Sequence, residues 1–228
     1  MTLIQSKSLI LNFFIVAVAS LGMAEAQSTT TAEGSWVGSW AAAQQIPEPQ
    51  NALASEDLRD ATLRQIVHLS VGGPVLRVHL SNAFGTAPLH FASVHIARPV
   101  SAGAAKIDPA SDKALSFSGS SDVTVPAGAE FISDPIDYPV AAGSNLAVTL
   151  HLDAPPAQET GHPGSRATSY LVHGDQVSAA DLPDAKKVDH WYQLAGVDVI
   201  APSNATAIVV LGDSITDGHG ATTNGNDR

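Results

Sequence analysis

The residues of this sequence that could do chemistry lie in one short segment. The segment GDSITDG, residues 212–218, directly follows the apolar run TAIVVL, residues 206–211. A continuous apolar run of this length is typical of a strand buried on both faces of a parallel sheet. Such a sheet presents reactive groups at its carboxyl edge, where a serine hydroxyl can act as a nucleophile. Ser214 is therefore the candidate nucleophile, and we expect its backbone N–H to face a developing oxyanion.

The same segment resembles the first block of the GDSL, or SGNH, hydrolases, a family of esterases and lipases. The upstream stretches WVGSWAAAQQ (36–45), TLRQIVHLSVGG (62–73) and LSNAFGTAPL (80–89) are similar to the β domain that precedes the hydrolase domain in one secreted subgroup. The resemblance implies that Ser214 is the nucleophile and that its own N–H contributes to the oxyanion hole. It assigns Asp213 to the support of this loop, not to a catalytic triad.

The family completes its site with residues that this sequence does not show. They are a Gly and an Asn from two later blocks, and an Asp-x-x-His near the C-terminus that supplies the triad His and Asp. Asn226-Asp227 begins twelve residues after Ser214, too early for an Asn block that follows a later strand. His219 lies five residues after Ser214 on the same loop, with no partner expected to orient its ring. We therefore expect an N-terminal fragment of a longer enzyme, inactive alone.

Other chemical motifs are not supported. A calcium loop fails because Ile215 occupies a ligand position and no glutamate closes the segment. The G-x-S-x-G elbow fails at Thr216. The nine histidines show no tight ligand spacing, so we expect neither a metal nor an organic cofactor. Three tryptophans offer a sugar-stacking platform, but packing in a core is the favoured interpretation for Trp36, Trp40 and Trp191.

The elements that precede this segment alternate with period two. Residues 62–71 and 75–82 flank Gly72-Gly73-Pro74 and are predicted to form a hairpin. In the second of these strands, Leu76, Val78 and Leu80 share one face, while the residues between them share the other face. This alternation is typical of a half-buried sheet with one side towards the core.

Further strand-like segments follow, separated by turn residues, and no window shows a convincing helical period. They span residues 89–97, 115–118, 122–125, 130–136, 145–152, 167–173 and 190–199. The sequence therefore predicts a mostly β fold: an antiparallel β-sandwich of jelly-roll type over residues 34–200. The first strand and nucleophile loop of an α/β SGNH hydrolase domain are expected to follow over residues 206–228.

Composition excludes several classes of protein. The 228 residues contain 11 Lys plus Arg and 22 Asp plus Glu, a net charge of -11, so we expect no nucleic-acid partner. Hydrophobic residues make up 44% of the chain, enough for a globular core. The absence of cysteine excludes disulfides, thiolate catalysis and cysteine zinc sites.

The first 26 residues are predicted to be a signal peptide. Lys7 is the only charge before an apolar run of 13 residues, 9–21, and Ala24-Glu25-Ala26 supplies a cleavage site. A membrane-spanning helix needs roughly 20 apolar residues, so a stable anchor is disfavoured. We expect a mature N-terminus at Gln27 and a secreted or periplasmic protein.

Together these features predict an exported serine esterase. Ser214 is expected to attack an ester carbonyl and form an acyl-enzyme that water hydrolyses. Acetyl esters on polysaccharides are the leading expected substrate, because an added β-sandwich suits a polymeric target, and short-chain aryl and lipid esters stay open. The alternative is a non-catalytic carbohydrate-binding or adhesive β-sandwich module, in which GDSITDG is a remnant.

Overall fold

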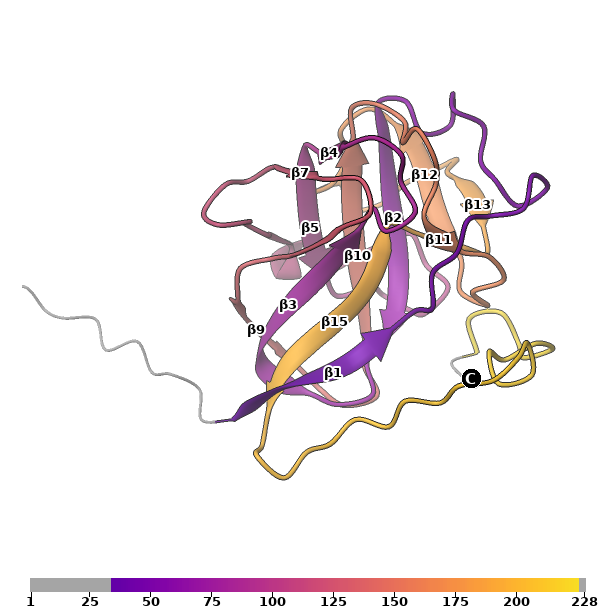
Figure 1. The fold of residues 1–228 in the computed structure, drawn as a ribbon. Helices are drawn as coiled ribbons and strands as arrows, with labels where there is room; N and C mark the ends of the chain where they lie inside the picture. The colour runs from indigo at the N-terminus through magenta and orange to yellow at the C-terminus, as the bar shows by residue number, and fades with distance from the viewer. Residues whose placement is uncertain (1–33, 226–228) are drawn as a thin grey trace, which may run out of the picture. The chain divides into compact units, whose positions relative to one another are not determined.

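The computed structural model describes residues 34–225 (Figure 1). The predicted signal peptide, the predicted N-terminus at Gln27 and Asn226-Asp227 lie outside the described residues. The described residues all belong to one compact unit. The 3-10 turn η1 (Pro109–Ser111) is the only helical element within residues 34–225. Accordingly, this part of the chain contains no helix that is long and apolar enough to cross a membrane.

Two larger sheets account for most of the described strands, and every strand pair in them is antiparallel. In the first sheet the order is β1-β15-β3-β8, and β9 also pairs with β3. Its strands are β1 (Ser35–Ala41), β3 (Gly73–Ser81), β8 (Glu130–Ile132), β9 (Ile136–Val140) and β15 (Leu194–Ala201).

The second sheet has the order β13-β12-β2-β10-β5-β6. Its strands are β2 (Ala61–His68), β5 (Ser93–Ala97), β6 (Lys113–Ala114), β10 (Asn145–Leu152), β12 (Ser169–His173) and β13 (Lys186–Val188). Two small antiparallel pairs join β4 (Leu89–Phe91) to β7 (Val123–Val125) and β11 (Gly161–His162) to β14 (Trp191–Tyr192).

The two larger sheets share one hydrophobic core. Leu76 and Val197 from the first sheet and Leu63 and Leu150 from the second are each fully buried within the same cluster. Figure 1 shows β1, β3 and β15 running obliquely in front of β2, β10 and β12. The prediction of a mostly β fold with antiparallel sheets is confirmed.

The predicted hairpin of residues 62–71 and 75–82 is wrong, because β2 and β3 belong to different sheets. Between them the chain bonds to other segments: the Leu69 N–H donates to Ser144 O at 2.8 Å, and the Ser70 N–H to Ser39 O at 2.9 Å. The connection therefore crosses from one sheet to the other. The predicted alternation in the second strand is confirmed, since Leu76, Val78 and Leu80 are all fully buried.

Strand β2 does not have a solvent face, because Arg64 on its outer side is completely buried. The guanidinium donates to Thr149 Oγ1 and to three backbone carbonyl oxygens, those of Ala105, Val177 and Ala179. These hydrogen bonds tie two long loops over the second sheet. Burial of the guanidinium lowers the pKa of Arg64 from its ordinary value, but the group has many hydrogen-bond acceptors around its charge.

The other predicted strands agree with the structure to different degrees. Residues 145–152 coincide with β10, whereas 89–97 divides at Ala92 into β4 and β5. The 190–199 segment divides at Gln193, a left-handed residue with φ +52°. The 115–118 segment forms no named strand, although Leu115 and Phe117 are core residues.

The apolar run at residues 206–211 does not form the predicted buried strand. It is extended, belongs to no named strand, and exposes 92% of Val209 and 98% of Leu211 (Figure 1). The strands of a parallel sheet are held by hydrogen-bonded neighbours on both edges. No strand within residues 34–225 lies beside this run to supply them.

Candidate functional site

The GDSITDG segment closes on itself through backbone hydrogen bonds. The Asp217 N–H donates to Asp213 O at 3.1 Å, and the His219 N–H donates to Ser214 O at 2.7 Å. Gly218 supports this closure, because its φ of +86° is readily available only to glycine. Ser214 therefore lies in a compact turn although the strand before it is missing.

Two residues at the start of the turn shape its backbone. Asp213 Oδ1 accepts a hydrogen bond from the Ile215 N–H at 3.0 Å, which is the side-chain geometry that stabilises a turn. At Gly212 a Cβ would lie 2.0 Å from Thr216 Oγ1, so only glycine fits there. The Asp213 hydrogen bond fixes the backbone beside Ser214, and the position of Thr216 leaves no room for a side chain at Gly212.

The Ser214 side chain is exposed and has no base beside it. Among residues 34–225, no group forms a hydrogen bond with the Ser214 hydroxyl or accepts one from its backbone N–H. The His219 ring is engaged elsewhere: its Nδ1 lies 3.3 Å from the Arg166 guanidinium, which can only donate, so Nδ1 accepts. The turn offers a hydroxyl and an oxyanion donor, but no group that would take the hydroxyl proton.

The turn contacts the sandwich through a histidine that no sequence motif indicates. His162 Nε2, on β11, lies 2.9 Å from Asp217 Oδ1. The His162 Nδ1 faces Ala43 O, and the ring packs at a tilt against Trp191, with the ring centroids 5.9 Å apart. The His162 side chain is only 9% exposed, so its neighbours fix the orientation of the ring.

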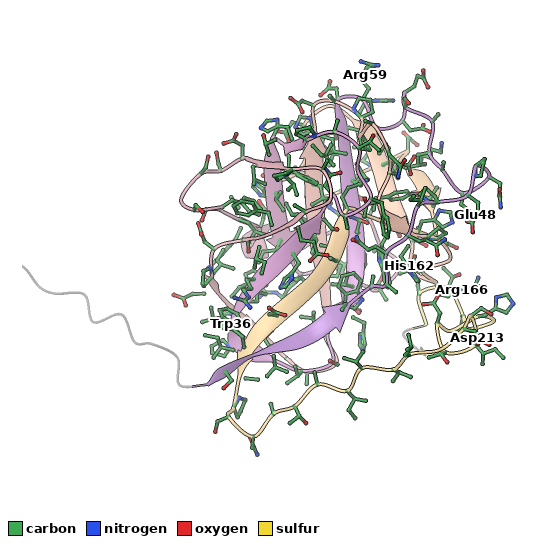
Figure 2. All side chains as sticks on the ribbon, viewed as in Figure 1. Trp36, Glu48, Arg59, His162, Arg166 and Asp213 are labelled. Carbon is green, nitrogen blue, oxygen red and sulfur yellow. The ribbon has the colours of Figure 1, made fainter. Side chains whose placement is uncertain are left out.

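A second contact joins the loop after β11 to the chain beyond the turn. The Thr168 N–H donates to Asn224 Oδ1, and Asn224 Nδ2 donates to Thr168 Oγ1, both at 2.9 Å. The Asn224 N–H also donates to Arg166 O at 2.7 Å. Asp189 accepts from both sides, from Thr168 Oγ1 and from Thr223 Oγ1. Figure 2 labels His162, Arg166 and Asp213 in this region.

A cavity of about 430 Å³ lies between this part of the sandwich and the carboxyl-terminal segment. Trp40 and Trp191 line it from the sandwich, and Asp217 lines it from the turn. Arg166 also lines the cavity, and its buried Nε has no hydrogen-bond partner. The cavity thus combines aromatic walls with a guanidinium that pairs with no carboxylate in the described part of the chain.

The other histidines form structural pairs. His95 lies 3.0 Å from Asp112 and 3.4 Å from Ser178 Oγ, but both contacts use Nδ1, whereas a relay needs opposite ring nitrogens. His79 shares Asp198 with Arg77 on the outer face of the first sheet. Within residues 34–225, no group of histidine and acidic side chains has the arrangement to hold a metal ion.

The tryptophans are occupied by packing. Trp191 is 4% exposed and its indole N–H donates to Ile66 O, while Trp40 meets it edge-on, with centroids 4.7 Å apart. The Arg77 guanidinium lies over the Trp36 ring, and its Cζ is 4.3 Å from the ring centroid. The predicted packing role is confirmed for Trp191, and no open stacking platform of three rings exists.

Comparison with known proteins adds no assignment: no protein-family model matches the chain, and neither does any curated protein. The resemblance to the SGNH hydrolases therefore depends on the residues quoted above. The contacts of His162, Thr168 and Asn224 carry no local sequence signal, because they join segments more than 50 residues apart. They become visible only when the fold is known.

Proposed function

We propose that this chain carries the nucleophile segment of an exported ester hydrolase of SGNH type, with Ser214 as the nucleophile. The observation that carries the proposal is the state of Ser214. Its hydroxyl and backbone N–H are both unengaged within the described chain, at the head of a hydrogen-bonded turn that Asp213 stabilises. A nucleophile and an oxyanion donor on one hydrogen-bonded turn suit acyl transfer.

The reaction follows from these two groups. Ser214 Oγ attacks the ester carbonyl carbon and gives its proton to a base, while the carbonyl oxygen becomes an oxyanion that the Ser214 N–H stabilises. The C–O bond to the alcohol breaks, and the base returns the proton to the leaving oxygen. Water then attacks the acyl-enzyme and releases the acid and the free serine.

We propose that the general base for Ser214 is supplied by a further portion of the protein. All nine histidines of the chain fall within the described residues, and none of them contacts the Ser214 hydroxyl. The exposed apolar run at 206–211 supports the same proposal. We infer that it is the first strand of an α/β hydrolase domain, preceded by a jelly-roll-like accessory sandwich.

Acetyl esters on polysaccharides are the proposed substrate class. A secreted or periplasmic location, inferred from residues 1–26, places the enzyme where such polymers occur. The cavity beside the turn, lined by Thr216 and Asp217, has room for the sugar part of such an ester. No metal or organic cofactor takes part in this proposal.

The test is covalent labelling together with turnover of a short-chain aryl ester by the complete protein. Ser214→Ala is expected to abolish labelling by a serine-directed phosphonate and to lower kcat by about 10⁴-fold or more. Ser178→Ala is the matched control, because Ser178 is exposed and lies near His95. Full activity of Ser214→Ala would overturn the assignment.

A second candidate function is a non-catalytic carbohydrate-binding module. The absence of a base beside Ser214 in residues 34–225 is the observation that favours it. Binding of acetylated polysaccharide by the complete protein, without release of acetate and without labelling of Ser214, would support this alternative.

A further inference from the structure

The sandwich and the nucleophile turn are joined by side chains from a single edge of the β fold. His162 contacts Asp217, Thr168 pairs with Asn224, and Asp189 accepts from Thr223. The three sandwich residues lie on β11, on the loop before β12 and on the turn before β14. This edge of the sandwich therefore contacts the carboxyl-terminal segment on both sides of Gly220, at Asp217 and again at residues 223 and 224.

His162 is held in place before it meets the turn. Its Nδ1 faces a backbone carbonyl oxygen, which can only accept, and its Nε2 faces the carboxylate of Asp217. His162 therefore meets an acceptor at each ring nitrogen, one on the sandwich and one on the turn. The His162 side chain is only 9% exposed and packs against Trp191, so its neighbours in the sandwich hold the ring in the orientation that faces Asp217.

Asp217 links His162 to the turn that contains Ser214. Its backbone N–H donates to Asp213 O, so fixing Asp217 fixes both ends of the short turn that contains Ser214. The His219 N–H donates to Ser214 O, a second hydrogen bond that closes the turn around the serine. A displacement of Asp217 would therefore move the Ser214 hydroxyl and N–H relative to a bound ester.

We propose that His162 is a positioning residue for the nucleophile, and that the β-sandwich fixes the Ser214 turn through the His162–Asp217 pair, with Thr168–Asn224 as a second point of attachment. This inference rests on the proposed function. It makes the sandwich a working part of the catalytic site, whereas a separate carbohydrate-binding module would have no need to hold the nucleophile turn.

The first test measures the turn itself, by hydrogen exchange of backbone amides in the 228-residue chain. In His162→Gln and in Asp217→Asn, exchange at the Asp217 and His219 amides is expected to quicken by about tenfold, because the turn opens more often. His95→Gln is the matched control, since it breaks a half-buried histidine–aspartate pair away from the turn. Unchanged exchange at Asp217 and His219 in both variants would overturn the proposal, whatever the enzyme does.

The second test measures catalysis by the complete protein. A misplaced nucleophile lowers kcat by about 10- to 100-fold and changes KM little. We expect this for His162→Gln and Asp217→Asn, with no further loss in the double variant, whereas His95→Gln keeps its kcat. Asp217 is 44% exposed in its side chain, so Asp217→Asn reports on positioning even if His162→Gln unfolds the edge. Additive losses, or a kcat unchanged in Asp217→Asn, would contradict the positioning role.

The two tests separate failure of this inference from failure of the proposed function. Quickened exchange in the 228-residue chain, together with full activity of Ser214→Ala, would retain the attachment of the turn and reject Ser214 as the nucleophile. Normal exchange and normal kcat in the His162 and Asp217 variants, with Ser214→Ala inactive, would retain the esterase and reject the positioning role.

Discussion

Two partly buried titratable residues, His162 and Glu159, lie three positions apart and differ in how their polar atoms are satisfied. His162 finds a hydrogen-bond partner for each ring nitrogen. Glu159 finds one: its Oε1 accepts from the Leu53 N–H at 2.9 Å, while its buried Oε2 has no partner. Burial, assisted by the nearby carboxylate of Asp57, raises the pKa of Glu159 to about 7. His162 is therefore held by two partners, whereas ionisation of Glu159 places a charge on a buried oxygen and lowers the stability of the folded state.

The raised pKa of Glu159 predicts a specific dependence of stability on pH. Below the ordinary carboxyl pKa near 4.5 both folded and unfolded states hold the proton, and the contribution to stability is fully present. As pH rises to about 7 the unfolded state releases this proton first, and the free energy of unfolding falls. Glu159→Gln keeps the oxygen that accepts from Leu53, so relative to the wild type it is expected to gain about 1 kcal/mol between pH 4 and pH 8.

Urea denaturation at several pH values measures this gain. The expected gain is smaller than the full effect of the pKa shift, because the carboxyl group is only partly buried and water screens its charge. Glu130→Gln, an exposed glutamate on β8, is the control and should follow the wild type at each pH. A parallel pH dependence in Glu159→Gln and the wild type would show that Oε2 is solvated.

At the scale of elements, the segment at 206–211 combines the composition of a buried strand with the exposure of a linker. Ile208 and Val209 are 89% and 92% exposed, far more than a folded domain normally leaves around a run of apolar residues. Its strand propensity is satisfied only by neighbouring strands, since a lone strand has unpaired N–H and C=O groups on both edges. The segment is thus expected to promote self-association of the protein and to add nothing to the stability of the sandwich.

Charged substitutions in this segment test that expectation. Val209→Asp combined with Leu211→Asp should change the free energy of unfolding of the sandwich by less than about 0.5 kcal/mol, because both side chains already contact water. The same double variant should reduce self-association, measured by sedimentation velocity. Val199→Asp on β15, which places a charge at a fully buried position, is the contrasting control and should destabilise by several kcal/mol. A loss above 2 kcal/mol in the double variant would mean that the segment packs on the sandwich.

The elements also show what sequence patterns can and cannot predict. The alternation in β3 gave its buried face correctly, because a strand with one solvent face has a simple period. The pairing of β2 with β3 could not be predicted, since a Gly-Gly-Pro turn permits a hairpin and a crossover equally. Strand β2 is covered on both faces, and only the loops tied to Arg64 explain how its polar residue is buried. The pairing of strands depends on distant segments of the chain, whereas the hydrophobic period within one strand does not.

At the candidate site, the sequence identified the residue types and missed their environment. Ser214 and Asp213 were found from a local motif, and the structure places them in one hydrogen-bonded turn. His162 was missed because a two-residue strand has no periodic pattern, and its partner Asp217 lies 55 positions further along the chain. Contacts of this kind follow from how the sheet edge folds, so they need coordinates.

At the scale of the whole molecule, the two larger sheets share one core, while a second and smaller cluster of buried residues, among them Ile66 and Tyr170, lies against the second sheet. The cluster that contains Leu150 from the second sheet also contains Val197 and Val199 from the first, and all three side chains are fully buried. Neither sheet can open without exposing the apolar face of the other. With no cysteine in the chain, this packing carries the stability that disulfides supply in many exported domains.

The shared core predicts that both sheets unfold in one cooperative transition. Leu150→Ala in the second sheet removes a fully buried side chain and should cost about 2–5 kcal/mol. Because the two sheets share that core, the loss should lower the urea midpoint equally by far-UV circular dichroism and by tryptophan fluorescence, which reports on Trp36 and Trp40 in β1 and on Trp191 in β14. Val197→Ala in the first sheet should shift both signals together in the same way. Midpoints that separate between the two probes in either variant would show that the sheets form independent units and that the core is divided between them.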